Sequence, residues 1–405
     1  MVKENTMKQT EIGLLPEDWE VVQLKQIANF QNGLAHENIE SEFGEYVVIN
    51  SKFISQDGRV YRKVTKQLLP LVKDDLCIVM SDIPNGKALG KCYLIEQDGK
   101  YTLNQRIGRI APLKDNSKYL FYALNRNNYF LSFDSGSGQT NLRKEEILVC
   151  QIPLPPLPEQ EAIAEALSDA DAWIESLEQL IAKKRLIKQG AMQELLAPKE
   201  DWEEKTIFEV ADKKRDLFND GDWIEAVHIK EEGIRLIQTG NIGVGRFLNK
   251  NNKKYISEKS FVELKCKEIV EGDLLICRLA EPAGRVCIFP KTEDLKSVTS
   301  VDVTIYRPDE NVFDRRILLY LLSTDEWFKQ VLEQVGGTTH KRISRGNLGN
   351  IKIKIPKSLT EQTRIATILS DMDAELEALE AQLRKARQVK QGMMQELLTG
   401  RVRLV

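Results

Sequence analysis

Residues Glu159–Leu196 read EQEAIAEALSDADAWIESLEQLIAKKRLIKQGAMQELL, and residues Glu361–Leu398 read EQTRIATILSDMDAELEALEAQLRKARQVKQGMMQELL. The two stretches align without a gap at an offset of 202 residues, and 22 of their 38 positions are identical. Identity of this extent at a fixed offset indicates an internal duplication. The chain is therefore organised as one segment, the repeated stretch, a second segment and the repeated stretch again.

Both copies have the residue spacing of a coiled coil. Apolar residues, with a few lysines among them, recur at alternating steps of four and three, which is typical of a seam between two packed helices. Prolines at 153, 155, 156 and 158 should stop any helix before Glu159, and Pro198 and Gly400 should end the two helices. The predicted seam consists of Ile163, Leu167, Ala170, Ile174, Leu177, Ile181, Lys184, Lys188, Ala191 and Leu195, and of Ile365, Leu369, Met372, Leu376, Leu379, Leu383, Ala386, Lys390, Met393 and Leu397.

Charge predicts how the two helices pair. The first copy carries seven acidic residues and no basic one between Glu159 and Glu178, and basic residues follow from Lys183 onward. The second copy repeats this order. Parallel helices would place acid against acid, whereas antiparallel helices place acid against base. We therefore expect an antiparallel pair related by an approximate two-fold axis.

The segments before the helices have the composition of globular domains, and they share little sequence beyond their ends. The predicted fold class is α+β, with two α/β domains in inverted orientation joined by two long antiparallel coiled-coil helices. The predicted parts are an N-terminal domain at 1–154, the first helix at 155–198, a second domain at 199–356 and the second helix at 357–405.

Short β-like runs and turn residues predict the elements of these domains. An Asp98-Gly99 turn between two apolar runs predicts a hairpin. The predicted strands are Glu45–Ile49, Asp75–Met80, Leu274–Cys277 and Ser300–Tyr306, and the predicted helices are Tyr119–Leu131 and Arg316–Val331.

Composition excludes several classes of protein. No apolar run is long enough to span a bilayer, no secretion signal opens the chain, and we expect a cytoplasmic protein. Six scattered cysteines without a CxxC pair, and only three histidines, argue against a disulfide framework or a zinc site. The net charge of −3 argues against a uniformly basic surface for nucleic acid, although it leaves room for local basic faces.

Catalytic motifs are not found in the sequence. There is no P-loop, and Gly243-Val244-Gly245 lacks the third glycine of a dinucleotide-binding loop. A methyltransferase of base amino groups would need a Gly-rich cofactor loop and an Asn/Asp-Pro-Pro-aromatic stretch, and neither occurs. Asp82 with Asp98 and Lys100 is a loose match to a metal-dependent nuclease. We therefore predict a non-catalytic chain that itself holds no cofactor or metal.

Basic residues beside turn-forming residues are the candidate DNA contacts. Each domain has one loop rich in Gly, Ser, Thr and Asn followed by basic residues, at 135–144 and at 336–345. Exposed N–H groups and cations converge in such loops, which suits phosphate contact. Because basic and acidic residues balance in both domains, we expect a partner to add affinity. The candidates are Arg59, Arg62, Lys63, Arg143, Lys144, Arg246, Thr338, Thr339, His340, Lys341, Arg342 and Arg345.

The sequence resembles the specificity subunits of type I restriction–modification systems. The resemblance lies in the opening Thr10–Val22, which reads TEIGLLPEDWEVV, in both helical blocks with their closing KQGxMQELL, in both Gly-rich loops and in the tail LLTGRVRL. It covers the whole chain in order. It implies two target-recognition domains in inverted orientation on paired long helices, and the absence of catalytic motifs agrees with it.

The resemblance also implies partners. They are double-stranded DNA, two methyltransferase subunits and restriction–translocase subunits, with S-adenosylmethionine, ATP and Mg in the partner subunits and no membrane. Two dissimilar domains would read an asymmetric bipartite target whose spacer is set by the helices. A coiled-coil adaptor without sequence-selective DNA binding and a self-contained metal-dependent nuclease stay as alternatives.

Overall fold

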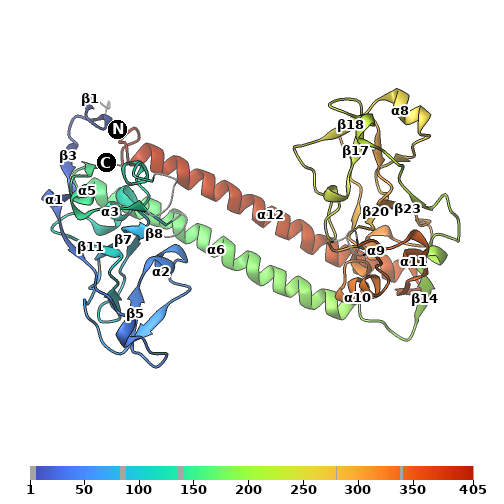
Figure 1. Cartoon of the computed structure of the whole chain (residues 1–405), viewed down its shortest axis with the longest axis horizontal. Coiled ribbons are helices and arrows are strands. Elements are labelled where there is room, and N and C mark those ends of the chain that lie inside the picture. Colours follow the sequence, from blue (N-terminus) through green and yellow to red (C-terminus); the bar gives the residue numbers. More distant parts are fainter. Residues whose placement is uncertain (1–5, 83–87, 135–139, 280, 338–340, 405) are drawn as a thin grey trace. The chain divides into compact units, whose positions relative to one another are not determined.

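The computed structural model describes residues 6–82, 88–134, 140–279, 281–337 and 341–404 (Figure 1). The chain divides into two compact units, unit 1 with residues 1–179 and 381–405, and unit 2 with residues 180–380. Each unit thus contains one globular domain, the first part of one long helix and the last part of the other. Among the described residues, no helix has the length and apolar character required to cross a membrane.

The duplicated stretches form two helices of equal length. Helix α6 spans Leu157–Leu195 and helix α12 spans Leu359–Leu397, each with 39 residues. Helix α6 begins two residues earlier than expected, because a proline in the first turn of a helix removes no internal hydrogen bond. Helix α12 ends before Gly400, which has a φ of +66° and lies so close to Pro16 that a Cβ atom would clash at 2.4 Å.

Within each unit the two helix segments run antiparallel, as their charges predict. In unit 1, Arg387 pairs with Glu178 at 2.6 Å and Lys390 pairs with Asp171. In unit 2, Arg185 pairs with Glu380 at 2.6 Å, and these are the same two positions of the repeat with the copies exchanged. All predicted seam residues are buried or half-buried. The prediction of a packed helix pair is therefore confirmed.

The globular domain of unit 1 contains two main sheets, one antiparallel and one mixed. A four-stranded sheet has the order β4-β11-β7-β9, and a three-stranded sheet has the order β10-β5-β6 with β10 and β5 parallel. The bounds are β4 Ala28–Asn32, β11 Ile107–Pro112, β7 Leu76–Val79, β9 Cys92–Leu94, β10 Tyr101–Leu103, β5 Tyr46–Ile49 and β6 Arg62–Val64, with α2 at Ser51–Ser55.

The globular domain of unit 2 repeats this topology. Its four-stranded sheet has the order β15-β23-β20-β21, and its five-stranded sheet has the order β16-β18-β17-β22-β19 with β17 and β22 parallel. The bounds are β15 Phe218–Asp220, β23 Val303–Tyr306, β20 Leu274–Cys277, β21 Val286–Ile288, β16 Ile229–Lys230, β18 Lys254–Ile256, β17 Ile234–Ile237, β22 Ser297–Thr299 and β19 Glu268–Ile269, with α8 at Glu258–Glu263. The two domains are therefore variants of one fold.

In each unit a strand pair leads into the long helix. Strand β3 (Glu20–Gln23) pairs with β13 (Gln151–Leu154) before α6, and β14 (Trp202–Thr206) pairs with β24 (Lys352–Pro356) before α12. The remaining elements are β1 Met7–Thr10, β2 Gly13–Pro16, α1 Leu24–Ile27, β8 Ser81–Asp82, α3 Ser117–Leu124, α4 Asn128–Leu131, β12 Thr140–Asn141 and α5 Lys144–Leu148 in unit 1, α7 Ile207–Val210, α9 Arg315–Leu321, α10 Asp325–Glu333 and α11 Arg345–Asn350 in unit 2, and three short 3₁₀ turns.

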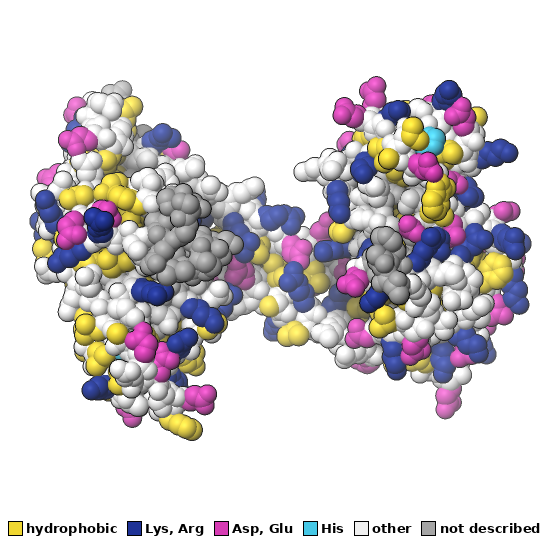
Figure 2. Space-filling model, viewed as in Figure 1, with side chains coloured by type: hydrophobic (Ala, Val, Ile, Leu, Met, Phe, Trp, Pro, Cys, Tyr) yellow, Lys and Arg dark blue, Asp and Glu magenta, His cyan; other side chains and the backbone are white. Residues whose placement is uncertain are grey.

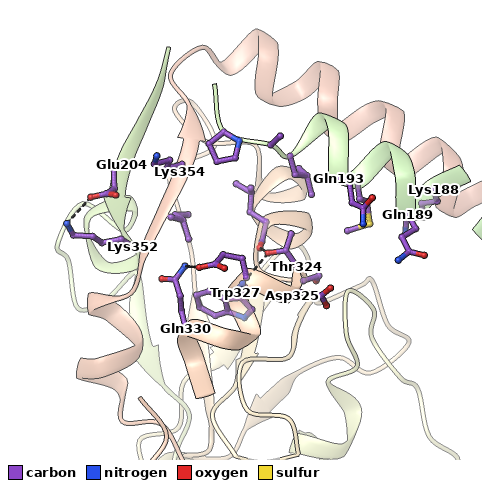
Figure 3. A pocket seen from close by; sticks show the side chains of 18 of the residues that line it. Lys188, Gln189, Gln193, Glu204, Thr324, Asp325, Trp327, Gln330, Lys352 and Lys354 are labelled. Carbon is purple, nitrogen blue, oxygen red and sulfur yellow. Dashed lines mark hydrogen bonds and ion pairs between the residues drawn. The ribbon is translucent and has the colours of Figure 1, made fainter. Parts of the chain in front are cut away.

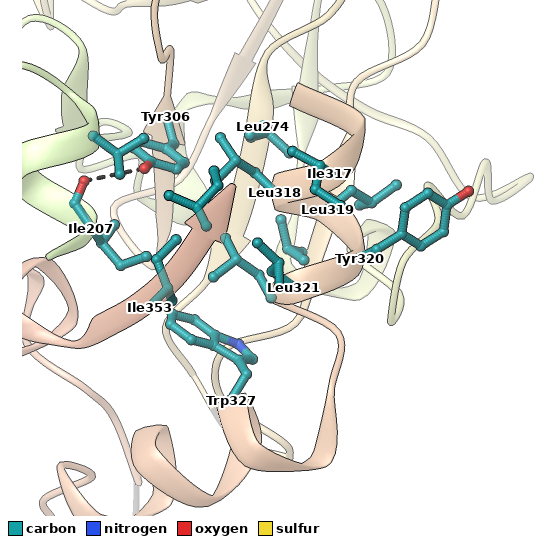
Figure 4. Close-up of a cluster of buried hydrophobic side chains, with 14 of the residues drawn as sticks. Ile207, Leu274, Tyr306, Ile317, Leu318, Leu319, Tyr320, Leu321, Trp327 and Ile353 are labelled. Carbon is teal, nitrogen blue, oxygen red and sulfur yellow. Dashed lines mark hydrogen bonds between the residues drawn. The ribbon is translucent and has the colours of Figure 1, made fainter. Parts of the chain in front are cut away.

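The core of each unit joins the domain to the start of its long helix. In unit 2, Leu318, Tyr306 and Trp327 pack in one cluster that also includes Ile365 and Leu369 of α12 (Figure 4). In unit 1 the corresponding cluster includes Ile163 and Leu167 of α6. Burial of apolar area is the main favourable term in folding. The burial of apolar side chains that folds each domain therefore also attaches the domain to its long helix.

The expected strands are confirmed, whereas both expected helices are divided. All four predicted strands occur within two or three residues of their expected bounds. The predicted helix Tyr119–Leu131 is instead two helices, α3 and α4, because Arg126 adopts a positive φ of 54°. Likewise Arg316–Val331 divides into α9 and α10, and the side chain of Thr324 caps the second of them.

The predicted hairpin at Asp98-Gly99 is wrong. Strand β9 pairs with β7 in the four-stranded sheet, whereas β10 pairs with β5 in the three-stranded sheet. The turn is real, since Gly99 has a φ of +74°. It connects two sheets rather than two neighbouring strands, and the local turn signal does not distinguish these cases.

A terminal clasp, made of Asp18, Trp19, Glu159 and Arg403, closes unit 1. Arg403 donates to both carboxylate oxygens of Glu159, at 2.6 and 2.7 Å, and to both of Asp18, at 2.9 and 2.8 Å. The Nε1 of Trp19 donates to Glu159 at 3.0 Å. The Glu159 side chain is almost completely buried. The clasp therefore supplies the cation that a buried carboxylate requires.

Replacing Arg403 should destabilise unit 1. We expect Arg403→Ala to lower the free energy of unfolding by about 3 kcal/mol, because Glu159 would keep a buried charge without its cation. Arg401→Ala is the matched control: Arg401 is exposed, its carboxylate partner Glu396 lies at 3.7 Å, and its loss should cost less than about 1 kcal/mol. Urea unfolding followed by tryptophan fluorescence measures both, and equal losses would contradict this role for the clasp.

Candidate nucleic-acid interface

The two Gly-rich loops end in equivalent places. In unit 1 the Leu142 N–H donates to the carbonyl of Met80, just after β7, at 2.7 Å. In unit 2 the Ile343 N–H donates to the carbonyl of Arg278, just after β20, at 3.0 Å. A short helix follows each loop, α5 in unit 1 and α11 in unit 2. The described ends of the two loops are therefore anchored at equivalent places, in agreement with the prediction that the loops are counterparts.

Basic residues that follow the loop in unit 2 are held by carboxylates. Arg342 forms an ion pair with Asp302 at 3.1 Å. Arg345 donates to the side-chain oxygen of Asn219 at 2.9 Å and lies 3.7 Å from Asp220. Both arginines are half-buried. Their contacts anchor the end of the loop, so part of their charge is already neutralised within the unit.

Arg278 was not identified from the sequence, and it is a buried arginine that shares the Asp220 carboxylate with Arg345. Its side chain is 3% exposed, pairs with Asp220 at 3.0 Å and donates to the carbonyl of Ile343 at 3.1 Å. Burial lowers the pKa of Arg278, and the nearby charge of Asp220 opposes this shift. The only sequence signal for a buried arginine here was its position directly after the continuous apolar strand β20. Arg278 thus ties the end of the loop to the four-stranded sheet.

Lys341 remains an exposed cation at the end of the same loop. Thr338, Thr339 and His340 lie outside the described residues. The exposed ammonium of Lys341 can contact a phosphate at little desolvation cost.

The candidates of unit 1 fall into two groups. Arg59 is exposed before β6, and on β6 itself Arg62 pairs with Glu40 at 2.9 Å and Lys63 is half-buried. Arg143 and Lys144 are exposed at the start of α5. Figure 1 shows β5, the neighbour of β6, well away from α5 within this unit. The two basic clusters that the sequence analysis proposed for this unit therefore lie apart.

Arg246 lies in a tight turn of unit 2. The Gly243 N–H donates to the Arg246 carbonyl at 2.9 Å, and Gly245 has a φ of +68°. The Arg246 side chain is exposed. Over the visible face of each unit, basic side chains are interspersed with acidic ones (Figure 2). On this face, therefore, local clusters rather than a continuous basic surface are available to nucleic acid.

Two of the three residues that match a metal-dependent nuclease, Asp98 and Lys100, have other contacts in the structure. The Asp98 carboxylate accepts a hydrogen bond from the Lys73 N–H at 2.7 Å, and the Lys100 ammonium lies 5.2 Å from the ring centre of Tyr101. The side chain of Asp82 lies outside the described part. Among the described residues, no three His, Cys, Asp or Glu side chains are grouped closely enough to hold a metal ion.

A groove of about 860 Å³ lies in unit 2 (Figure 3). It is bounded by the C-terminal part of α6, by α10 and by β24. Met192, Leu196 and Trp327 contribute apolar surface, while Lys352 and Glu204 form an ion pair at 2.8 Å at its edge. An apolar floor with a charged edge suits a protein segment.

Comparisons with known proteins agree on one family. The model described as "Type I restriction modification DNA specificity domain" matches residues 16–184 and 199–386. The chain is 25% identical to the type I restriction enzyme MjaVIII specificity subunit of Methanocaldococcus jannaschii, over 99% of this chain and 97% of the relative. It is 24% identical to the type I restriction enzyme EcoBI specificity subunit of Escherichia coli, over 70% of this chain and 65% of the relative.

Solved structures agree on the fold. The type I restriction–modification S subunit from M. genitalium aligns with a TM-score of 0.62 at 16% identity, covering 98% of both chains. A chain from structural work on complex assembly and conformational transition of the type I R-M system aligns with a TM-score of 0.55 at 18% identity, covering 96% of this chain and 99% of the other.

Removing Arg278 should destabilise the end of the loop in unit 2. We expect Arg278→Met to lower the free energy of unfolding by about 3 kcal/mol, because half-buried Asp220 would lose its closest cation and the carbonyl of Ile343 its buried donor. Lys341→Met replaces an exposed neighbour by the same side chain and should change stability by less than about 0.5 kcal/mol. Urea denaturation of both variants gives the comparison. Similar stabilities would show that Arg278 does not support the loop.

Proposed function

Since the chain belongs to the family of type I restriction–modification DNA specificity subunits, we propose that it reads an asymmetric, bipartite DNA target with one half-site per unit. In this proposal each globular domain is a target-recognition domain. The chain itself performs no catalysis and selects the site for the subunits that it binds.

One observation carries the proposal: the two domains share a topology but little sequence. A common fold on duplicated helices presents equivalent loops to DNA, while different side chains on those loops select different bases. Two identical domains would favour a symmetric target. Two different domains favour an asymmetric one.

The ends of the Gly-rich loops are the proposed phosphate contacts. Lys341 is exposed just before the anchored Ile343 in unit 2, and Arg143 and Lys144 are exposed just after the anchored Leu142 in unit 1, where α5 begins. Phosphate contacts fix the position of a protein on DNA, whereas base contacts carry the specificity. Because the chain has a net charge of −3, additional affinity would come from its partners.

Methyltransferase subunits are the proposed partners of the helices. Several apolar side chains on α6 and α12 are exposed, and Leu186 has 69% of its surface accessible. Apolar side chains on a polar helix, together with the groove beside α6 in unit 2, provide surface for protein contact. In the proposed assembly two such subunits would bind S-adenosylmethionine, and restriction–translocase subunits would use ATP and Mg.

The helix pair is the proposed ruler for the spacer between the half-sites. Each helix has 39 residues, which corresponds to about 58 Å at 1.5 Å per residue. Half-sites read in successive major grooves lie about 34–36 Å apart. A rigid helix pair therefore has sufficient length to define one fixed gap.

Methylome sequencing tests the proposed function. Cells that express this chain with its methyltransferase partner should carry a modified motif of two short, different blocks around a fixed gap, and cells without this chain should lack it. A symmetric motif would contradict the assignment of one half-site to each domain. No motif despite a purified, intact complex would favour the protein adaptor.

Salt dependence tests the phosphate contacts. In the assembled complex, Lys341→Ala should weaken binding to all DNA sequences and reduce the slope of log K against log[salt] by about 1, because one counterion fewer is released. Lys259→Ala is the control, since Lys259 is an exposed lysine on α8. Fluorescence anisotropy between about 50 and 200 mM salt measures the slopes. The same slope for both variants would remove Lys341 from the interface.

A further inference from the structure

Each unit contains a cluster that links its globular domain to both long helices. In unit 1 the first Tyr–Asp–Lys cluster consists of Tyr122 on α3, Asp171 on α6 and Lys390 on α12. The Tyr122 hydroxyl donates to Asp171 at 2.8 Å. Lys390 pairs with the other oxygen of Asp171, and its ammonium lies 5.5 Å from the centre of the Tyr122 ring. Three elements therefore meet at one carboxylate.

The second Tyr–Asp–Lys cluster has the same geometry in unit 2. It consists of Tyr320 on α9, Asp373 on α12 and Lys188 on α6. The Tyr320 hydroxyl donates to Asp373 at 2.8 Å, Lys188 pairs with the other oxygen, and its ammonium lies 5.5 Å from the ring centre. The two long helices have exchanged roles, so the helix that supplies aspartate in one unit supplies lysine in the other.

The tyrosines are the informative members. The aspartates and the lysines belong to the duplicated stretch and recur at its offset of 202 residues. Tyr122 and Tyr320 lie outside that stretch, in domains that share little sequence, at an offset of 198. The same contact therefore occurs in both units, in short stretches that also share Leu120 with Leu318 and Leu124 with Leu322 at that offset.

A second anchor holds the other end of the same short helix. The buried Gln160 side chain accepts a hydrogen bond from the N–H of Asn116, which caps α3, at 2.9 Å. Gln362 accepts from the N–H of Asp314, which caps α9, also at 2.9 Å. Each short helix is therefore held at its start by a glutamine and near its end by the tyrosine. Two points along one helix fix its direction, whereas one point would leave a hinge.

We infer that the two Tyr–Asp–Lys clusters are positioning devices that fix the angle of each recognition domain on the helix pair, and so make the complex selective for one spacer length. The inference rests on the proposed function, because a spacer exists only if the two units read two half-sites. The residues touch no DNA in this scheme and act through the short helices α3 and α9.

The chemistry of the tyrosines suits a permanent contact. Burial raises the pKa of Tyr122, and its hydrogen bond to Asp171 raises it further. The pKa of Tyr320 is raised by the same two causes in the same order. Both hydroxyls therefore stay protonated and donate to the aspartates at any physiological pH. Hydrogen bonds to a charged acceptor are among the stronger ones in proteins.

The test uses the full chain assembled with its methyltransferase partner and a set of DNA targets. The targets share both half-sites of the motif found for the unaltered complex and differ only in spacer length, from two base pairs shorter to two longer. Methylation rates are compared for the unaltered chain and for the double variant Tyr122→Phe with Tyr320→Phe, which keeps both rings. We expect the rate at off-length spacers, relative to the natural spacer, to rise about tenfold, while the half-site bases stay the same.

Tyr119→Phe is the matched control. Tyr119 lies on the same helix α3, is fully buried and donates its hydroxyl to the carbonyl of Pro153 at 2.5 Å rather than to a long helix. Its loss should lower stability without widening the range of accepted spacers. An unchanged spacer preference in the double variant, with a lower rate at every spacer, would reduce the clusters to ordinary stabilising contacts and overturn the inference.

A second double variant keeps the test decisive if the phenylalanines impair folding. Lys188→Met with Lys390→Met removes the ion pairs and leaves both tyrosine hydrogen bonds. A smaller widening, about threefold, is expected, and none at all would again overturn the inference. If the unaltered complex itself gives no bipartite motif, the proposed function fails instead, and this outcome is seen before any variant is measured.

Discussion

The antiparallel pairing of the two copies of one helix is the constraint on which the rest of the structure depends. Each copy is acidic in its first half and basic in its second, so each needs a partner that runs the other way. Within each unit this brings Glu178 to Arg387 or Glu380 to Arg185. Single exposed ion pairs contribute little stability. As a repeated pattern they select one direction of packing over the other.

Duplication also explains which parts of the two domains agree. The elements that contact the long helices are equivalent in the two domains. The contact residues of the helices are equivalent too, including the buried Gln160 and Gln362 and the apolar residues at the start of each helix. The parts farther from the helices differ, since the three-stranded sheet of unit 1 corresponds to five strands in unit 2. A shared frame with divergent outer parts agrees with the proposed function, in which the frame would set position and the outer parts would set chemistry.

The sequence predicted the elements that depend on local pattern. The long helices, their antiparallel pairing and the main strands follow from periodicity and charge, and those predictions are confirmed. The hairpin at Asp98-Gly99 failed because a turn does not reveal which sheet receives the next strand. The division of Tyr119–Leu131 into two helices was not predicted, because an arginine gives no sequence signal for the positive φ that Arg126 adopts. The boundaries of the two domains and of the two helical parts stay a prediction.

The candidate DNA contacts were predicted less completely. Arg342 and Arg345 were grouped with Lys341 because neighbouring cations look alike in sequence, yet they pair with Asp302 and Asp220, which are distant along the chain. Arg278 and the two Tyr–Asp–Lys clusters were missed for the same reason. Contacts between residues tens to hundreds of positions apart leave no spacing signal, and only the fold brings them together. The role of the twelve candidates at DNA stays a prediction.

Unit 1 is built from two separate segments of the chain, and this has a consequence for synthesis on the ribosome. This unit consists of the first 179 residues together with residues 381–405, whereas unit 2 is one continuous stretch. Domains fold as they emerge, beginning from the N-terminus. The domain of unit 1 emerges first, but its share of α12 and Arg403 of the terminal clasp emerge only after all of unit 2. The unit whose synthesis begins first is therefore completed last. Until α12 and Arg403 are made, the seam residues of α6 and the Glu159 carboxylate lack their native partners.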